Sequence, residues 1–112
     1  DPALLSVRID QSLYFANARF LEDFIYKRVM GHSEIKDVVL MFPAVNEVDL
    51  SALESLEAIN SRLKDVGIRL HLSEVKGPVM DRLKRSHLLQ ELSGEVFLSQ
   101  YDAWRRLTKA DG

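Results

Sequence analysis

Asp49 and Ser51 are the residues whose types and spacing most suggest chemistry. They lie in "VNEVDLSAL", after an apolar run and at the start of a predicted helix. A hydroxyl this close to a carboxylate could be a phosphorylation switch, or it could begin the helix. Glu54 follows Ser51 at capping-box spacing, in which the Ser51 hydroxyl accepts from the Glu54 N–H and the Glu54 carboxylate accepts from the Ser51 N–H. Because no His or Lys stands nearby in the sequence to activate the hydroxyl, capping is the favoured interpretation and no catalytic residue is predicted.

Two polar loops, Pro43–Leu50 and Ser73–Pro78, each precede a predicted helix. Loops at the carboxyl ends of strands carry the binding sites of open α/β sheets, and helix N-termini can bind anions. The first loop is interpreted as a regulatory or interaction loop formed by Asn46, Glu47, Asp49, Leu50 and Ser51. The second could bind an anion or nucleotide through Ser73, Glu74, Lys76 and Gly77. Acidic side chains in both loops, and the lack of a Gly-rich phosphate pattern, make this an alternative hypothesis.

The histidines do not suggest a metal site. His32, His71 and His87 lie in different predicted elements, without the helical spacing of a ligand pair, and the chain has no cysteine. We therefore predict neither a metal ion nor a cofactor. His71 is expected on the polar face of an alternating strand.

Composition and charge restrict the function further. The chain has 112 residues, one domain by length, with a net charge of −2 and no dense run of Lys or Arg. This disfavours nucleic acid and an anionic membrane surface as partners. The longest apolar run, Val38–Val45, is too short to span a bilayer. Because the chain does not begin with Met, we expect residues 1–112 to be one domain excised from a longer protein.

The first third of the chain predicts two strands and a helix. Leu4–Ile9 is a strand, and Ser12–Ala16 is a second short strand that pairs with it through Asp10-Gln11. Asn17 is then the predicted N-cap of a helix that ends near Gly31. The apolar stripe of that helix comprises Leu21, Phe24, Ile25 and Val29.

The centre of the chain predicts a parallel βαβ unit. Val38–Phe42 is apolar without alternation, which is typical of a strand buried on both faces. A helix runs from Ser51 to Val66 and stops at Gly67, and Ile68–Val75 then alternates as a strand.

The last third predicts two helices and one strand. Gly77-Pro78 begins a helix with proline in its first turn. Glu95–Ser99 is a short strand. The closing helix carries Tyr101, Trp104 and Leu107, and its predicted cap is Ser99 with Asp102 reaching back.

Four aromatic residues near the first helix are assigned chiefly to the core: Tyr14, Phe15, Phe20 and Phe24. Tyr14 and Phe15 are adjacent, so a strand would direct one ring inward and the other outward. The outward ring is a candidate contact for a partner chain.

Two segments resemble the STAS domain, a module shared by bacterial anti-sigma factor antagonists and the cytoplasmic tails of SulP-type anion permeases. "SLYFANARFLED" (Ser12–Asp23) is similar to the strand-to-helix signature of the transporter branch. "VVLMFPAVNEVDLSALESLEAINSRLKDVGIRLHLSEVKGPVMDRL" (Val38–Leu83) is similar to its central βαβ unit. The resemblance implies an α/β fold, with a mixed sheet of four to five strands and about four packed helices, and it implies no catalysis.

The resemblance also bears on the switch hypothesis. In stand-alone antagonists the corresponding loop has the pattern Asp-Ser-Ser/Thr-Gly, and the Ser directly after Asp is phosphorylated. Asp49 matches the Asp, Leu50 stands at the phosphorylated position, Ser51 matches the next hydroxyl residue and Ala52 replaces the Gly. The acceptor hydroxyl is therefore missing.

The transporter branch implies a regulatory, non-enzymatic domain at the cytoplasmic face of the inner membrane, within a sulfate, bicarbonate or dicarboxylate permease. The expected partners are the membrane domain of the same transporter, a cytosolic regulatory protein and, in the full-length protein, a second copy. A stand-alone phospho-switched antagonist and a nucleotide- or anion-sensing domain are the alternatives.

Overall fold

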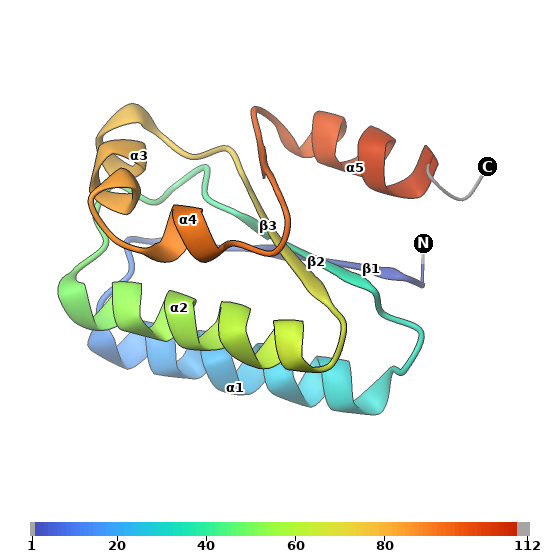
Figure 1. Cartoon of the computed structure of the whole chain (residues 1–112). Coiled ribbons are helices and arrows are strands. Elements are labelled where there is room, and N and C mark those ends of the chain that lie inside the picture. The colour runs from blue at the N-terminus through green and yellow to red at the C-terminus, as the bar shows by residue number, and fades with distance from the viewer. Residues whose placement is uncertain (1, 110–112) are drawn as a thin grey trace.

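The computed structural model describes residues 2–109, in which four parallel strands form one sheet in the order β1-β2-β3-β4 (Figure 1). The strands are β1 (Leu4–Arg8), β2 (Asp37–Met41), β3 (Arg69–Ser73) and β4 (Val96–Phe97). The helices are α1 (Phe15–Gly31), α2 (Leu50–Asp65), α3 (Gly77–Lys84), α4 (Leu88–Glu91) and α5 (Gln100–Lys109). These elements confirm the predicted α/β class and its parallel βαβ unit, β2-α2-β3. None of the helices in this part of the chain is both long and apolar enough to cross a bilayer.

The two faces of the sheet are covered unequally. α1 and α2 lie side by side along one face, and α5 lies on the other (Figure 1). Because side chains alternate along a strand, each strand contributes to both layers. The larger core takes its strand side chains from Leu5, Val38, Leu40, Leu70 and Leu72. The smaller core beneath α5 consists of Val39, Phe97, Ala103 and Leu107, with Leu4 and Met41 at its margin.

The predicted second strand, residues 12–16, is wrong. Leu13 makes a single parallel bridge with Val48, and α1 begins at Phe15. Asn17, predicted as the N-cap, lies three residues beyond the actual cap, Tyr14. Its side chain accepts from the Tyr14 N–H at 2.7 Å and donates to the Ser12 carbonyl at 2.7 Å. These two bonds satisfy backbone groups that a strand would otherwise have paired, so the helix begins early. Without this strand, all described strand pairs are parallel.

The assignment of four aromatic residues to the core is also wrong. Tyr14 is 45% exposed, Phe15 59%, Phe20 73% and Phe24 37%. The core side of α1 is instead formed by smaller residues, Ala18, Leu21 and Ile25. Because residues 14 and 15 begin a helix, neither ring is directed inward by strand alternation, and α1 has an aromatic outer surface.

The later elements largely follow the sequence prediction. Gly67 ends α2 with a φ of +79°, and Pro78 lies in the first turn of α3. The Ser99 hydroxyl accepts from the Asp102 N–H at 3.2 Å, which confirms the predicted capping role of Ser99 at the start of α5. The last strand is shorter than predicted, and the short helix α4 was not predicted.

The leucines of α2 provide a direct test of this packing. Leu56 is 1% exposed in the larger core, whereas Leu50 on the same helix is 64% exposed. We expect Leu56→Ala to lower the free energy of unfolding by about 2–5 kcal/mol, because the substitution leaves a cavity. Leu50→Ala, the matched control, should change it by less than about 0.5 kcal/mol. Chemical denaturation measures both values, and equal values for the two variants would contradict the orientation of α2.

Candidate functional site

Two segments that are far apart in sequence form one surface at the carboxyl end of the sheet. We call residues 12–17 and 46–49 together the loop junction. The Leu13 N–H donates to the Glu47 carbonyl at 2.9 Å, and the Asp49 N–H donates to the Leu13 carbonyl at 3.1 Å. The Ser12 hydroxyl accepts from the N–H groups of Asn46 and Glu47 at 3.1 and 3.0 Å. The junction is therefore a hydrogen-bonded unit rather than two independent loops.

Tyr14 and Glu47 make the closest side-chain contact of the junction. The Tyr14 hydroxyl donates to Glu47 Oε2 at 2.5 Å. This hydrogen bond to the carboxylate raises the pKa of Tyr14 above its usual value, with smaller contributions from desolvation and from the charge of Glu47. Tyr14 therefore stays protonated at neutral pH and acts as a donor, which makes it unsuitable as a general base.

The predicted capping box of Ser51 and Glu54 is wrong. Asp49 is the N-cap of α2, and its Oδ1 accepts from the Ala52 N–H at 2.8 Å. The helix begins at Leu50, so Ser51 lies inside the first turn with an exposed side chain. Asp49 is the better cap because its carboxylate also interacts favourably with the helix dipole.

A hollow of about 350 Å³ lies between the loop junction and the start of α3. It is lined by Tyr14, Asn46, Glu47, Val48, Asp49, Pro78, Val79, Arg82 and Arg85. Its charges are mixed, because two carboxylates face two guanidinium groups. Lys76 donates to Asn46 Oδ1 at 2.8 Å, and Arg82 donates to the Val48 carbonyl at 3.2 Å. Two of the nearby cations are therefore already bound to the junction, which suits recognition of a polar protein surface better than of a bare anion.

The second predicted loop does not act as one unit. Lys76 contacts the junction, whereas Ser73 is fully buried and its hydroxyl donates to Gln100 Oε1 at 3.1 Å. Glu74, which has a φ of +60°, accepts from the Gln100 N–H at 3.1 Å. Ser73 and Glu74 thus hold the start of α5, and the structure separates them from Lys76 and Gly77.

The sequence pattern did not predict two residues that organise this region. The Ser12 hydroxyl binds backbone groups of the junction, and Arg82 ties α3 to it. Asn17 was predicted at the helix start, although as the N-cap, because short polar side chains cluster there. The contact of Ser12 with Asn46 and Glu47 joins distant segments, and no local pattern predicts it.

His71 lies on the face of β3 opposite Leu70 and Leu72, as the predicted alternation requires, but this face is covered. His71 has no exposed surface, because the segment before β4 covers it. Its Nε2 lies 2.8 Å from Asp37 Oδ1, and Arg69 Nε donates to the same oxygen at 2.9 Å. Within residues 2–109, no three His, Asp or Glu side chains gather in a way that could hold a metal ion.

Comparisons with known proteins agree with the fold. A profile of the STAS domain family matches residues 1–103. Sulfate transporter 3.1 of Arabidopsis thaliana is 27% identical over 106 residues, which cover 87% of this chain and 16% of the transporter. The chain thus spans about a sixth of the length of that relative.

Two solved structures have the same fold. The STAS domain of a SulP transporter from Vibrio cholerae has a TM-score of 0.77 at 21% identity, covering 97% of this chain and 84% of its own. A protein from Thermotoga maritima described as an anti-sigma factor antagonist has a TM-score of 0.80 at 13% identity, covering 93% and 86%.

The corrected cap of α2 leads to a prediction. We expect Asp49→Ala to lower the free energy of unfolding by about 1 kcal/mol, because the Ala52 N–H loses its acceptor. Ser51→Ala should change it by less than about 0.5 kcal/mol. Asp49→Asn is the control, since it retains an oxygen at the cap. Urea denaturation distinguishes the two assignments, and a larger loss for Ser51→Ala than for Asp49→Ala would restore the capping box.

Proposed function

We propose, from the premise that this chain belongs to the STAS domain family, that it is a non-catalytic regulatory and interaction domain of a SulP-type anion transporter. The supporting observation is that most of the chain aligns with a short part of a plant sulfate transporter. The proposed cargo of the whole protein is sulfate, bicarbonate or a dicarboxylate. The proposed location of the domain is the cytoplasmic face of the inner membrane, at the C-terminal end of the transporter.

We further propose that the loop junction, with its exposed aromatic rings, forms the contact surface of the domain. Tyr14 and Phe15 of the junction are both substantially exposed, and so is Leu50, the residue that directly follows the junction in the sequence. Exposed aromatic side chains are common anchors of protein interfaces. Because hydrogen bonds already order the surrounding backbone, binding there needs little further ordering.

The proposed partners are the membrane domain of the same transporter and a cytosolic regulatory protein. A homodimer in the full-length protein is a further expectation. The mixed charges of the junction, with Glu47 and Asp49 facing Arg82 and Arg85, suit a protein surface of mixed charge. They offer no continuous basic surface to nucleic acid.

The non-catalytic part of the proposal rests on the chemistry of the junction. Its closest acid–base pair is Tyr14 and Glu47, and the raised pKa of Tyr14 keeps this residue a hydrogen-bond donor at neutral pH. Ser51, the exposed hydroxyl nearby, has no His or Lys in its part of the sequence to activate it, and the carboxylate of Asp49 is engaged as the helix cap.

One observation favours a second candidate, the phospho-switched antagonist. Because Asp49 caps α2, the exposed Ser51 hydroxyl is not needed for the cap. A phosphate in the first turn of α2 would lie at the favourable end of the helix dipole. Leu50 still stands where antagonists of this family carry the acceptor, so this remains the alternative. Phosphopeptide mapping of the protein from cells decides: phosphate on Ser51 would support it, and its absence would remove its mechanism.

The transporter proposal predicts an effect of the junction on transport. In the full-length protein encoded by the natural reading frame, the double substitution Tyr14→Ala and Phe15→Ala should lower anion uptake severalfold through loss of the contact. Phe20→Ala, the matched control, removes a ring that is more exposed but lies farther along α1, and it should leave uptake unchanged. Uptake of labelled sulfate, normalised to transporter abundance in the membrane, measures this.

Two results would contradict the proposal. One is a natural reading frame without hydrophobic spans outside residues 1–112. The other is unchanged uptake and abundance after deletion of the whole domain.

A further inference from the structure

His71 is held in one protonation state by its two contacts. It lies on the face of β3 that carries α5. Its Nδ1 accepts from the Glu95 N–H at 2.9 Å, and its Nε2 lies 2.8 Å from Asp37 Oδ1. A ring nitrogen accepts a hydrogen bond only when it carries no proton. The imidazole is therefore neutral, with its proton on Nε2 directed at Asp37.

Gly94 is what allows the backbone to approach the ring. A Cβ atom at this position would lie 2.4 Å from His71 Nδ1 and 2.4 Å from the Leu70 carbonyl oxygen. Such distances are far below van der Waals contact. The contact between Glu95 and His71 thus needs glycine at position 94.

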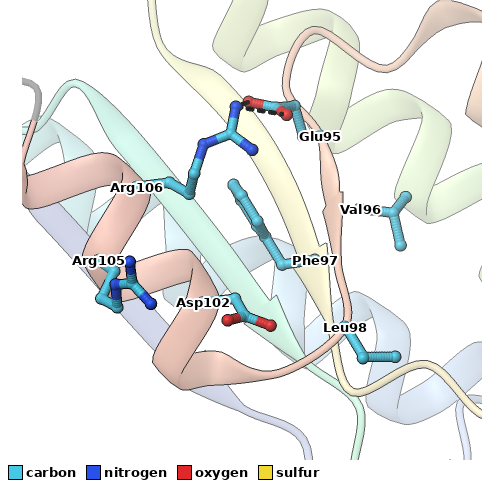
Figure 2. A pocket seen from close by; sticks show the side chains of 7 residues that line it. All are labelled: Glu95, Val96, Phe97, Leu98, Asp102, Arg105 and Arg106. Carbon is cyan, nitrogen blue, oxygen red and sulfur yellow. Dashed lines mark hydrogen bonds and ion pairs between the residues drawn. The ribbon is translucent and has the colours of Figure 1, made fainter.

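The segment of residues 95–109, which we call the C-terminal segment, is attached to the sheet by a small apolar cluster and, at the start of α5, by hydrogen bonds of Gln100 to Ser73, Glu74 and Ser6. β4 pairs with β3 through only two residue pairs, and the Leu72 N–H donates to the Glu95 carbonyl at 3.0 Å. Figure 2 shows the Phe97 side chain between β4 and α5, with Arg106 reaching Glu95. Elements with few buried apolar contacts open at the lowest free energy. The C-terminal segment is therefore the part of the sheet most readily released.

The groups that face His71 come from every element around it. Asp37 on β2 favours the protonated ring, while Arg69 on β3 opposes it and already binds the same Asp37 oxygen. From the C-terminal segment, the Glu95 carboxylate favours a proton but is paired with Arg106 at 3.3 Å. The Phe97 ring, 5.5 Å from the imidazole, contributes an apolar wall. Burial outweighs the carboxylates, so the pKa of His71 is lowered from its usual value.

We propose that His71 is a proton-operated latch on the C-terminal segment. A proton on Nδ1 replaces an acceptor with a donor that faces the Glu95 N–H, so the two groups repel. The C-terminal segment then leaves the sheet, while β1 to β3 with α1 and α2 stay folded. Release uncovers the apolar side chains of Val39 and Met41 beneath α5. The latch is a property of the fold and does not depend on the transporter assignment.

The direction of the pH dependence follows from the two states. In the released state His71 meets water and titrates near its ordinary pKa of about 6.5, whereas the latched ring has a lowered pKa. Between these two values the released state binds more protons, so acidification favours release. The ratio of released to latched molecules should rise by up to about tenfold per pH unit within that window. Above the ordinary pKa of about 6.5, this ratio should be independent of pH.

The single tryptophan, Trp104, lies on α5 and reports on release. We expect acrylamide quenching of its fluorescence to increase as the pH of the 112-residue chain falls from about 8 to about 5. In amide spectra over the same range, Glu95 and the residues of α5 should change together with the His71 ring. Amides of α1 and α2 should keep their shifts and their protection from exchange.

Three variants separate the latch from general acid sensitivity. His71→Gln has no titrating ring, so the pH dependence of quenching should disappear. His32→Gln is the matched control, because it removes an exposed histidine at the C-terminal end of α1, and it should leave the transition unchanged. Gly94→Ala should give the quenching of the released state already at neutral pH, because its Cβ displaces the ring.

Any of three outcomes would overturn the latch. The first is that His71 titrates while the Glu95 and α5 amides stay unchanged. The second is that all amides change at one midpoint, which would mean global unfolding. The third is a transition that persists in His71→Gln. The wild-type spectra alone decide the first two, so the test stands even if a variant fails to fold.

Discussion

The burial of β2 on both faces is the constraint from which the architecture follows. β2 lies between β1 and β3, and four of its five residues are buried. A parallel sheet needs cover on both sides, because neither face can be left to water. α1 and α2 supply a deep apolar layer on one side. In the described part of the chain, α5 and the residues that lead into β4 cover the other side, where the apolar cluster is smaller. The two layers therefore differ in size and in their content of polar residues.

The thinner layer explains why three of the polar residues on the sheet are buried. Asp37, His71 and Ser73 point to the α5 face, and burial of such groups is costly unless they are hydrogen-bonded. Asp37 binds Arg69 and His71, and Ser73 binds Gln100, so each group has a partner. The bond from Ser73 to Gln100 and the bond from the Glu95 N–H to His71 also hold the C-terminal segment, which the small apolar cluster would anchor only weakly. Polar pairing thus substitutes for core volume on this face, and it makes the attachment dependent on protonation.

The sequence predicted the elements that have a regular apolar pattern and a clear stop signal. The sequence predictions were wrong where segments that are far apart in the sequence contact each other. The apolar run of β2, the stripe of α2 and the stop at Gly67 are local signals, and all three are present in the structure. Residues 12–16 have a strand-like composition, yet their backbone groups bind Asn17 and the loop after β2 instead. Ser51 fitted a capping box, but Asp49, two residues earlier, took the position. His71 is buried because the backbone at Gly94 and Glu95 packs against it, and the alternation of residues within β3 does not predict this long-range contact.

The carboxyl end of the sheet and its α5 face therefore serve different physical purposes. At the carboxyl end of β2, the loop junction is held by backbone bonds and by Ser12, none of which titrates near neutral pH, so its shape is constant. Such a preorganised surface with exposed aromatic rings suits docking of a partner. On the α5 face, the attachment passes through an imidazole whose acceptor role ends when it gains a proton. A domain built in this way can keep its docking surface while the cover of its α5 face responds to acid. The reason is that His71 binds Asp37 and Glu95, which lie outside the larger core that supports the junction.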